Sequence, residues 1–337
     1  MTNKKIAVVI LNWNGAKLLE QFLPSIIAYS NEATIYVADN ASTDTSVQVI
    51  KTQFPNVKII QNDGNYGFAK GYNIALKHVE EEYYALVNSD IEVTENWLTP
   101  ILSIFETDEN SAIIQPKILD FKNKEKFEYA GAAGGFIDKY GYPFCRGRLF
   151  ETIEKDNHQF DDERQIFWAS GACFFIRKEV YRKLNGFDDD FFAHQEEIDL
   201  CWRAFNLGFT AKYTSKSVVY HVGGATLDQS NPKKTYLNFR NSLLMLLKNL
   251  PTRKLVPIIF MRLCLDGIAG IKFIFDGNFN HFLALFKAHC AFYTLIYRNL
   301  KKRSTIQNTN YFYTKSIVYH YFIKKHKKFE AIFNNTL

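Results

Sequence analysis

The sequence predicts an α/β protein built around a mostly parallel, doubly wound sheet. Short apolar runs rich in branched and aromatic residues alternate with amphipathic helical segments over residues 1–117. Repeated strand–helix units imply a parallel sheet with helices on both faces. Hydrophobic residues make up 47% of the 337 positions, which is enough for a large packed core.

The expected elements follow one another regularly. Buried strands are expected at 6–11, 34–38, 57–61, 84–88 and 112–117. Helices are expected between them at 16–29, 43–54, 68–79 and 97–107. Glycines interrupt the pattern over 119–164, where residues 138–141 are typical of a hairpin turn. Further on, we expect a strand within 165–177, helices at 178–184 and 195–207, a strand within 210–221, and helices beyond Lys234.

Charge is distributed unevenly along the chain. Residues 240–337 carry 16 Lys and Arg against 3 Asp and Glu, whereas residues 1–239 carry 25 against 32. A basic C-terminal part indicates contact with an anionic surface, either lipid headgroups or nucleic acid. The C-terminal part shows no nucleic-acid-binding motif, so we expect no nucleic-acid partner.

The five cysteines include no C-x-x-C pair, and an odd number argues against a disulfide framework. This usage favours a reducing compartment. The chain enters its first strand without a signal peptide, so we expect a cytoplasmic protein.

Polar residues follow four of the expected strands. In an open α/β sheet, ligands bind at the carboxyl ends of the strands, so these residues predict a pocket there. The residues are Asn12 and Asn14, Asp39 and Asn40, Asn62 and Asp63, and Asn88 to Asp90.

Two carboxylates at this edge have specific expected roles. Asp39 could accept the N3–H of uracil or thymine, which cytosine lacks; the alternative is a cap on the helix that follows. Asp90 suits a hard divalent cation, Mg²⁺ or Mn²⁺. The alternative for Asn88 to Asp90 is a turn that begins a helix.

Another candidate is the run Asn65-Tyr66-Gly67-Phe68-Ala69-Lys70-Gly71, which enters a helix. Its glycines permit close backbone approach, and a helix N-terminus favours phosphate. It lacks the G-x-G-x-x-G spacing, so a Rossmann dinucleotide site is not expected. We expect Asn65, Gly67 and Lys70 to bind a phosphate-bearing ligand, together with Trp168 in the Trp168-Ala169-Ser170-Gly171 run.

The helix expected at 195–207 carries the candidate general base. Glu196, Asp199 and Arg203 share one stripe and form an expected ion-pair set. Glu197 is rotated by about 100° from Glu196 and is free to point into a cleft, where it could take a proton. The alternative is a solvated acidic helix start that complements the helix dipole.

His221 ends a strand and is followed by Val222-Gly223-Gly224-Ala225-Thr226. The glycines would expose it, so it is the expected second metal ligand beside Asp90. The alternative is a packed histidine without a ligand role.

Together these motifs resemble glycosyltransferase family 2, in particular its rhamnosyltransferase-like members. The motifs are Ile10-Leu11-Asn12-Trp13-Asn14-Gly15, Asp39-Asn40-Ala41-Ser42-Thr43-Asp44, Asn65-Tyr66-Gly67-Phe68-Ala69, Asn88-Ser89-Asp90, Gly186-Phe187-Asp188 and Glu196-Glu197-Ile198-Asp199. The resemblance covers about residues 5–245, so we expect a catalytic domain at 1–245 and a helical region at 246–337. It implies a GT-A fold, a nucleotide-sugar donor, a divalent metal and inversion at the anomeric carbon.

By the same resemblance, Asp39 contacts the base and Asp90 ends the D-x-D-type metal motif. Glu197 matches the catalytic carboxylate, and His221 a histidine near the metal and diphosphate. Two positions depart from the family pattern. Asn88 replaces the first Asp of D-x-D, and Glu197 replaces the usual Asp, which leaves the choice between Glu196 and Glu197 open.

We therefore expect an inverting glycosyltransferase that moves a sugar from a UDP- or dTDP-sugar to a hydroxyl. The resemblance suggests rhamnose, with another hexose as the alternative. A glycan or polyprenyl-linked acceptor of cell-surface polysaccharide synthesis is expected. The alternatives are a nucleotidyltransferase and a non-catalytic nucleotide-sugar-binding module.

The C-terminal stretch 255–275 is long enough to span a bilayer. Its three charged residues, Arg262, Asp266 and Lys272, would be costly to bury in lipid and fall within a sector of roughly 120°. The expected apolar face comprises Leu255, Ile258, Ile259, Leu263, Leu265 and Phe273. This pattern is typical of a helix lying in the interface, here at the inner face of the membrane.

A second apolar stretch lies at 279–297, and basic clusters follow at 298–303 and 324–328. They would favour an anionic membrane surface. The alternative is a helical region that packs on the catalytic part with solvated lysines.

Overall fold

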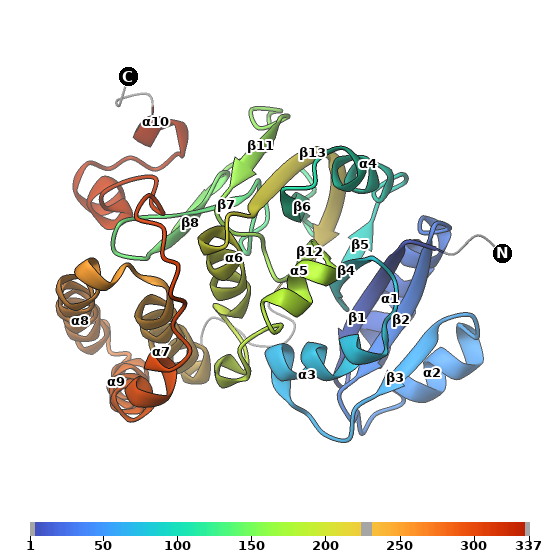
Figure 1. Cartoon of the computed structure of the whole chain (residues 1–337), viewed down its shortest axis with the longest axis horizontal. Helices are drawn as coiled ribbons and strands as arrows, with labels where there is room; N and C mark the ends of the chain where they lie inside the picture. The colour runs from blue at the N-terminus through green and yellow to red at the C-terminus, as the bar shows by residue number, and fades with distance from the viewer. Residues whose placement is uncertain (1–3, 224–230, 334–337) are drawn as a thin grey trace.

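The computed structural model describes residues 4–223 and 231–333 (Figure 1). Nine strands of these residues form one sheet, in the order β11-β13-β6-β12-β4-β1-β2-β3 with β5 beside β13. The strands are β1 (Ile6–Asn12), β2 (Ala33–Asp39), β3 (Lys58–Gln61), β4 (Tyr83–Asn88), β5 (Ile91–Val93), β6 (Ser111–Asp120), β11 (Glu163–Ile166), β12 (Cys173–Arg177) and β13 (Thr210–His221).

The sheet is parallel only in part. β1 to β4 pair in parallel, as the sequence predicts, and so do β6 and β13. The stretch 165–177, expected to hold one strand, instead contributes to two. β11 lines the outer edge of β13, and β12 runs antiparallel between β4 and β6. Because the chain turns back between these strands, the sheet is mixed rather than mostly parallel.

Helices cover both faces of the sheet. They are α1 (Ala16–Ala28), α2 (Ser46–Gln53), α3 (Gly67–Ala75), α4 (Thr99–Thr107), α5 (Lys178–Lys183) and α6 (Glu196–Asn206). In β1, Val8 joins the apolar cluster that includes α1 and α4, and Val9 joins the cluster that includes α3 and α6. Alternate side chains of a strand point to opposite faces, so β1 is buried on both sides. The doubly wound expectation is confirmed.

The glycine-rich stretch folds into a small antiparallel sheet of β7 (Gly135–Ile137), β8 (Pro143–Cys145), β9 (Arg148–Leu149) and β10 (Thr152–Ile153). The expected turn joins β7 and β8. The Asp138 carboxylate accepts the backbone N–H groups of Tyr140 and Tyr142, each at 2.9 Å. This side chain therefore fixes the hairpin, as residues of its type do in turns.

The C-terminal part consists of α7 (Pro232–Asn249), α8 (Thr252–Phe275), α9 (Phe279–Leu300) and the short α10 (Glu330–Phe333). The expected division at 245/246 falls inside α7, and one apolar cluster contains residues from both sides of it. Among the described residues, no helix is long and apolar enough to cross a membrane.

The structure reverses the expected orientation of α8. Arg262 and Asp266, assigned above to a lipid headgroup side, are 3% and 1% exposed. The Arg262 guanidinium donates to the Ser242 hydroxyl of α7 at 2.9 Å and to the Tyr140 carbonyl at 3.1 Å. The expected apolar face, including Ile258, packs on the protein instead. The membrane-facing assignment of these residues is therefore wrong.

Candidate active site

The carboxyl ends of β1, β2 and β4 bring several of the expected site residues together. Asn12 and Asp39 are partners in the register of β1 and β2, and Asn88 lies beside Leu11 on the other side of β1. The Asn12 amide donates to the Asp39 carboxylate at 2.9 Å. A polar edge therefore forms where the parallel strands end, as expected for a ligand site.

The Asp39 side chain is fully buried, and both of its carboxylate oxygens accept hydrogen bonds. One carboxylate oxygen accepts from Asn12 and from the Ser42 hydroxyl at 2.6 Å, and the other accepts the Ser42 backbone N–H at 2.9 Å. The alternative role as a helix cap is wrong, because α2 begins only at Ser46, where Asp44 accepts the backbone N–H at 2.9 Å. Asp39 instead holds the loop that follows β2.

Asn14 links two loops of this edge. Its side-chain oxygen accepts the Thr43 backbone N–H at 2.7 Å, and its own backbone N–H donates to Ser42 at 2.8 Å. Its φ of 52° lies in the left-handed region, which asparagine tolerates better than most residues. Asn14 therefore ties the loop after β1 to the loop after β2.

The start of α3 is closed rather than open to a phosphate. The Phe192 carbonyl accepts the second and third backbone N–H groups of the helix, from Phe68 at 2.7 Å and Ala69 at 3.4 Å. Gly67 has a φ of +71°, and a Cβ there would lie 2.6 Å from the Phe192 ring and carbonyl. The glycine thus serves the contact with the segment before α6, and the expected phosphate site at this helix start is not formed.

The neighbouring candidates lie at the surface beside this helix start. The Asn65 side chain accepts the Gly67 backbone N–H at 3.0 Å. The Lys70 ammonium stands over the Tyr66 ring, 4.1 Å from its centroid. Both are close to the polar edge, and Lys70 remains partly exposed.

Asp90 and His221 meet at the ends of their strands, as expected. The His221 Nε2 lies 3.2 Å from the Asp90 carboxylate, and its Nδ1 lies 3.2 Å from that of Glu128. All three side chains are buried. The sequence reasoning missed Glu128, because it lies in the glycine-interrupted stretch where no periodic signal marks it. Residues 224–226, expected to expose His221, lie outside the described ranges.

The charges of this trio shift the pKa values of His221 and Asp90. Burial lowers the pKa of His221, but the Asp90 and Glu128 carboxylates outweigh it and raise that pKa to about 10. Burial acts upward on the pKa of Asp90, whereas His221 and backbone N–H groups hold it below its usual range. The direction of each shift is that expected for a charged histidine beside the Asp90 carboxylate.

Residues 4–223 and 231–333 contain no group of three or more His, Cys, Asp or Glu side chains arranged to hold a metal. Asp90 and His221 nevertheless supply one oxygen and one nitrogen ligand that could complete a site together with donor phosphates. Metal binding would require His221 to release its proton. Glu128 would then accept the other ring N–H, as outer carboxylates do around metal-bound histidines.

The two adjacent glutamates open α6. Burial raises the pKa of Glu197 to about 7, although backbone N–H groups oppose the shift. Burial, followed by the charge of Glu197, also raises the pKa of Glu196. Each side chain has one buried oxygen without a hydrogen-bond partner in the described structure. Such unsatisfied, shifted carboxyl groups are typical of catalytic sites.

Their surroundings distinguish the two glutamates. Glu196 is 4% exposed, whereas Glu197 keeps more of its surface open. A Cβ at Gly171 would lie 3.7 Å from the Glu197 carboxyl carbon and 3.4 Å from the Phe68 ring. Residue 172, next to this glycine, accepts the Asn88 backbone N–H at 2.9 Å. Glu197 therefore lies beside a residue that has no side chain, close to the polar edge.

The expected ion-pair set on α6 forms without Glu196. Asp199 accepts from Arg203 at 2.8 Å and from the Lys248 ammonium of α7 at 2.9 Å. Lys248 also reaches Asp188 at 2.6 Å. Glu196 is left as a second unpaired carboxyl group beside Glu197 rather than a structural partner.

The segment before Glu196 has an unusual backbone. Phe192, His194 and Gln195 have φ values of 62°, 70° and 72°, a backbone region that residues other than glycine rarely adopt. The Asn241 amide of α7 donates to the carbonyls of Phe191 and Ala193, each at 2.9 Å, and of His194 at 2.7 Å. Strained backbone held by its surroundings is a feature of functional sites.

Sequence reasoning missed Asn241 and its neighbour Arg240, which donates to the Asp190 carbonyl at 2.8 Å. The sequence offers one signal, an Arg-Asn pair that interrupts the apolar run of a helix. The partners of this pair are backbone carbonyls about 50 positions away, and no sequence pattern identifies such partners.

Trp168 does not join the polar edge. Its indole N–H donates to the Phe136 carbonyl at 2.8 Å, and a Cβ at Gly135 would lie 2.1 Å from its ring. The side chain is 3% exposed. The structure thus assigns Trp168 to the core under β7, where it cannot contact a donor.

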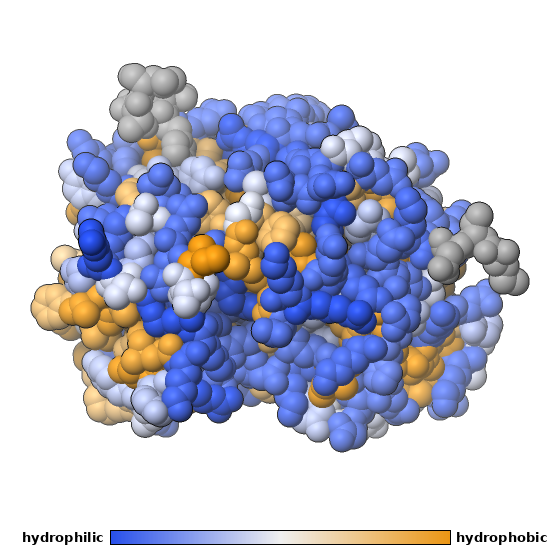
Figure 2. All heavy atoms as spheres, in the orientation of Figure 1, coloured by the Kyte–Doolittle hydropathy of each residue, from blue (hydrophilic) through white to orange (hydrophobic). Residues whose placement is uncertain are grey.

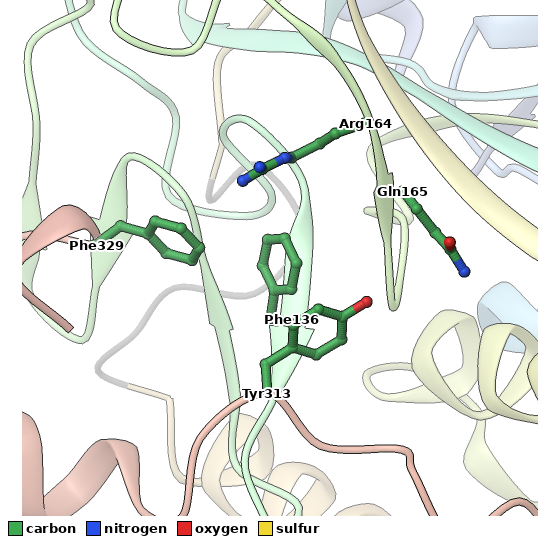
Figure 3. A pocket seen from close by; sticks show the side chains of 5 residues that line it. All are labelled: Phe136, Arg164, Gln165, Tyr313 and Phe329. Carbon is green, nitrogen blue, oxygen red and sulfur yellow. The ribbon is translucent and has the colours of Figure 1, made fainter. Parts of the chain in front are cut away.

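One hollow of about 440 Å³ lies elsewhere, lined by Phe136, Arg164, Gln165, Tyr313 and Phe329. Figure 3 shows Arg164 reaching across the aromatic rings, which come from distant parts of the chain. None of the expected site residues lines it. This hollow is therefore not the donor pocket expected from the strand ends.

Comparison with known proteins gives relatives that include rhamnosyltransferases. The L-rhamnosyltransferase of Mycobacterium tuberculosis that acts on N-acetylglucosaminyl-diphospho-decaprenol is 23% identical over 235 residues, covering 64% of this chain and 75% of that protein. The dTDP-rhamnosyl transferase RfbF of Shigella flexneri is 23% identical over 263 residues, covering 73% and 81%.

Solved structures show the same fold. GalNAc-T7 with UDP, GalNAc and Mn²⁺ superposes with a TM-score of 0.60 at 16% identity, covering 75% of this chain and 49% of that one. The mannosyltransferase of Pyrobaculum calidifontis with GDP-Man and Mn²⁺ superposes with a TM-score of 0.52 at 14% identity, covering 87% and 76%. The fold is that of the GT-A glycosyltransferases, with a helical C-terminal region added.

The family profile described as "Glycosyl transferase family 2" matches residues 7–184, which include β1 to β4 and the polar edge at their ends. This match favours sugar transfer over nucleotidyl transfer. The chain belongs to glycosyl transferase family 2.

Proposed function

We propose that this protein transfers a sugar, with inversion, from a uridine or thymidine diphosphate sugar to a hydroxyl group of a glycan or a polyprenyl-linked acceptor. Rhamnose is the proposed sugar, because two of the relatives described above transfer it. The polyprenyl-linked acceptor takes its support from the decaprenol of the mycobacterial relative.

Glu197 carries the proposal as the general base. Its raised pKa, its unpartnered oxygen and the bare Gly171 in front of it suit a group that takes a proton near neutral pH. Glu197 accepts the proton of the acceptor hydroxyl. The acceptor oxygen forms a bond to the anomeric carbon from the opposite face as the bond to the diphosphate oxygen breaks.

Asp90 and His221 would hold a Mg²⁺ or Mn²⁺ ion, which when bound offsets negative charge on the leaving diphosphate. Asn88 donates its backbone N–H to residue 172, so it positions the strand end beside them. Asn12, Asn14 and Asp39 form a bonded network that shapes the neighbouring loops.

Asp39 is proposed to read the base through its less-bonded oxygen, which accepts the Ser42 backbone N–H. That oxygen has a lone pair left for the N3–H of uracil or thymine. Because Asp39 is fully buried, the loop at 40–43 must move to admit the base.

The decisive experiment measures turnover and donor binding of two matched variants. Glu197→Gln should keep donor affinity and lose turnover by roughly 10²–10⁴-fold, the usual effect of removing a positioned base. Glu196→Gln, one position earlier, should retain most activity. The reverse result would assign the base to Glu196. Full activity of both variants would refute a carboxylate base on α6.

Slow release of free sugar from the donor without acceptor would mark the protein as an enzyme. Its complete absence for uridine and thymidine diphosphate sugars, together with tight donor binding, would favour the non-catalytic binding module instead.

A further inference from the structure

α8 has an apolar face that points away from the protein. Its outward residues recur every three or four positions, which keeps them on one side of a helix. They are Val256, Phe260, Cys264, Ile268, Ile271 and Phe275. Val256 is 77% exposed and Phe275 86%. The charged residues of the helix middle, Arg262 and Asp266, point inward, so this face carries no charge along its centre.

α9 carries a matching outward stripe. Its exposed residues alternate spacings of four and three over the whole helix, and they are Phe279, Leu283, Phe286, Cys290, Tyr293, Tyr297 and Leu300. The buried residues, including Ala288 and Phe292, lie on the opposite side. Solvent-exposed stripes of this length on two consecutive helices exceed the scattered apolar residues of an ordinary surface.

Both stripes point away from α7. α8 and α9 form a hairpin whose inner contact places Asp266 of α8 3.2 Å from His289 of α9. α7 lies beneath both helices. Its Ser242 side chain is hydrogen-bonded to Arg262 of α8, and its Thr235 side chain to His281 of α9. At 100° per residue, the outward stripe of each helix lies roughly opposite its contacts with α7. Figure 2 shows hydrophobic surface at the left, over α8 and α9.

Basic residues frame this two-helix face. Arg253 and Lys301 lie at one end, and Lys287 lies beside Phe286; all three are exposed. The Lys301 ammonium stands 4.3 Å from the centre of the Tyr297 ring. The acidic residues of 252–300 are Asp266, which is buried, and Asp276, which pairs with Lys272. The face is therefore apolar at its centre and cationic at its rim.

We propose that the outward face of α8 and α9 docks on the surface of a bilayer that contains anionic lipids. Apolar side chains would enter the boundary between headgroups and acyl chains while the rim residues meet anionic headgroups. A second copy of the chain fits less well, because a shared contact would place the same cationic rims against each other. Docking would hold the protein at the membrane that carries the polyprenyl-linked acceptor proposed above.

Flotation of the full chain with vesicles tests this docking. The protein should float with vesicles of phosphatidylglycerol and phosphatidylcholine at low salt, and less with phosphatidylcholine alone. Phe260→Ser and Phe286→Ser should each lower the partition coefficient by about tenfold, because each removes one large apolar side chain that the bilayer would bury. Lys287→Gln should lower it by about fivefold on anionic vesicles only.

Tyr29→Ser is the matched control. Tyr29 is 41% exposed beside α1, in the N-terminal part of the chain, so this change should leave flotation unaltered. Thermal unfolding of each variant confirms folding, which the exposed positions should not disturb. The readout is lipid binding, so it is independent of sugar transfer.

Two outcomes would overturn the docking. One is a wild-type chain that stays with the unbound fraction at low salt for both vesicle types. The other is flotation that Phe260→Ser and Phe286→Ser leave unchanged. Sedimentation without lipid tests whether a second copy of the chain covers this face instead. Self-association of the wild type that both variants abolish, together with a lack of flotation, would assign the face to a second copy.

Discussion

The Asn241 side-chain amide donates to the His194 carbonyl at 2.7 Å, and so joins a helix of the C-terminal part to the loop that precedes the candidate base. His194 has a φ of 70°, a conformation that is costly for a residue with a side chain. The same amide reaches the Phe191 and Ala193 carbonyls. One side chain therefore holds the strained segment that precedes Glu197.

Asn241→Ala should lower kcat by roughly tenfold to a hundredfold, because small misplacements of a catalytic group are costly. The donor KM should change little, since the donor candidates lie on other loops. The free energy of unfolding should fall by about 1–3 kcal/mol, the cost of leaving buried carbonyls without donors. Ser242→Ala, which loses the hydrogen bonds with Arg262 and with the Phe239 carbonyl but none with the strained segment, is the control. An equal loss of kcat in both variants would contradict the positioning role.

Glu197→Gln should stabilise the protein at pH 8. The pKa of Glu197 is raised from 4.5 to about 7, so the folded state binds this proton more tightly than the unfolded state. Its favourable contribution is present below pH 4.5 and is lost as the pH rises through about 7. Above that pH the ionised group destabilises the fold, and Gln should restore on the order of 1–3 kcal/mol.

Thermal or urea unfolding at pH 4.5 and pH 8 checks this difference. The variant and the wild type should converge at the lower pH. A variant less stable than the wild type at pH 8 would show that the buried glutamate is not destabilising.

The pH dependence of turnover should follow the same group. A base must be unprotonated to act, so wild-type kcat should rise with pH and level off above about 7. The residual rate of Glu197→Gln should lack this step. Initial rates from pH 5.5 to 9 measure it with donor and acceptor saturating. A rise that persists unchanged in the variant would assign the titration to another group.

Asp90→Asn should abolish the gain in donor affinity that Mn²⁺ provides, while the fold is retained. The change keeps the side-chain shape and removes the anionic ligand, and a loss of at least about tenfold is expected. Calorimetric titration of uridine or thymidine diphosphate with and without Mn²⁺ measures the effect. Glu92→Gln, in the adjoining strand, is the control because Glu92 pairs with Lys124. Unchanged metal-dependent affinity in Asp90→Asn would remove Asp90 from the metal site.

Gly67→Ala should be strongly destabilising or inactivating. Alanine at φ +71° carries backbone strain of about 1–2 kcal/mol, and its Cβ would in addition lie 2.6 Å from Phe192. Gly208→Ala separates the two effects, since Gly208 has a φ of +89° and open space around it. Unfolding measurements should show a clearly larger loss for Gly67. Equal losses would mean that Phe192 moves aside without cost.

Sequence alone determined the parallel half of the sheet and the residues at its carboxyl edge. Strands buried on both faces leave long apolar runs, and the polar residues that end them, such as Asn12 and Asp39, fall at one edge because parallel strands share a direction. Sequence also placed Asp90 and His221 at strand ends, where the structure brings them within 3.2 Å. These features depend on local periodicity and strand direction, which a sequence records.

Tertiary structure alone decided which distant groups complete the site. Glu128 reaches His221 from an irregular stretch, and Asn241 reaches the loop before Glu197 from a helix about 50 positions later. Gly67 was expected to allow the close approach of a phosphate. In the structure, the absence of a Cβ allows the close approach of the Phe192 backbone instead. Contacts between segments far apart in sequence produce no regular residue spacing from which they could be predicted.

The orientation of α8 shows the same division most clearly. Its sequence is apolar on nearly every side, so its length indicates a helix but its periodicity cannot decide which face meets the protein. The Ser242 hydroxyl and the Tyr140 carbonyl determine the orientation of α8, because both accept hydrogen bonds from the Arg262 guanidinium in the protein interior. A buried charge with good partners is retained there, and the unpartnered apolar side chains are left to face outward.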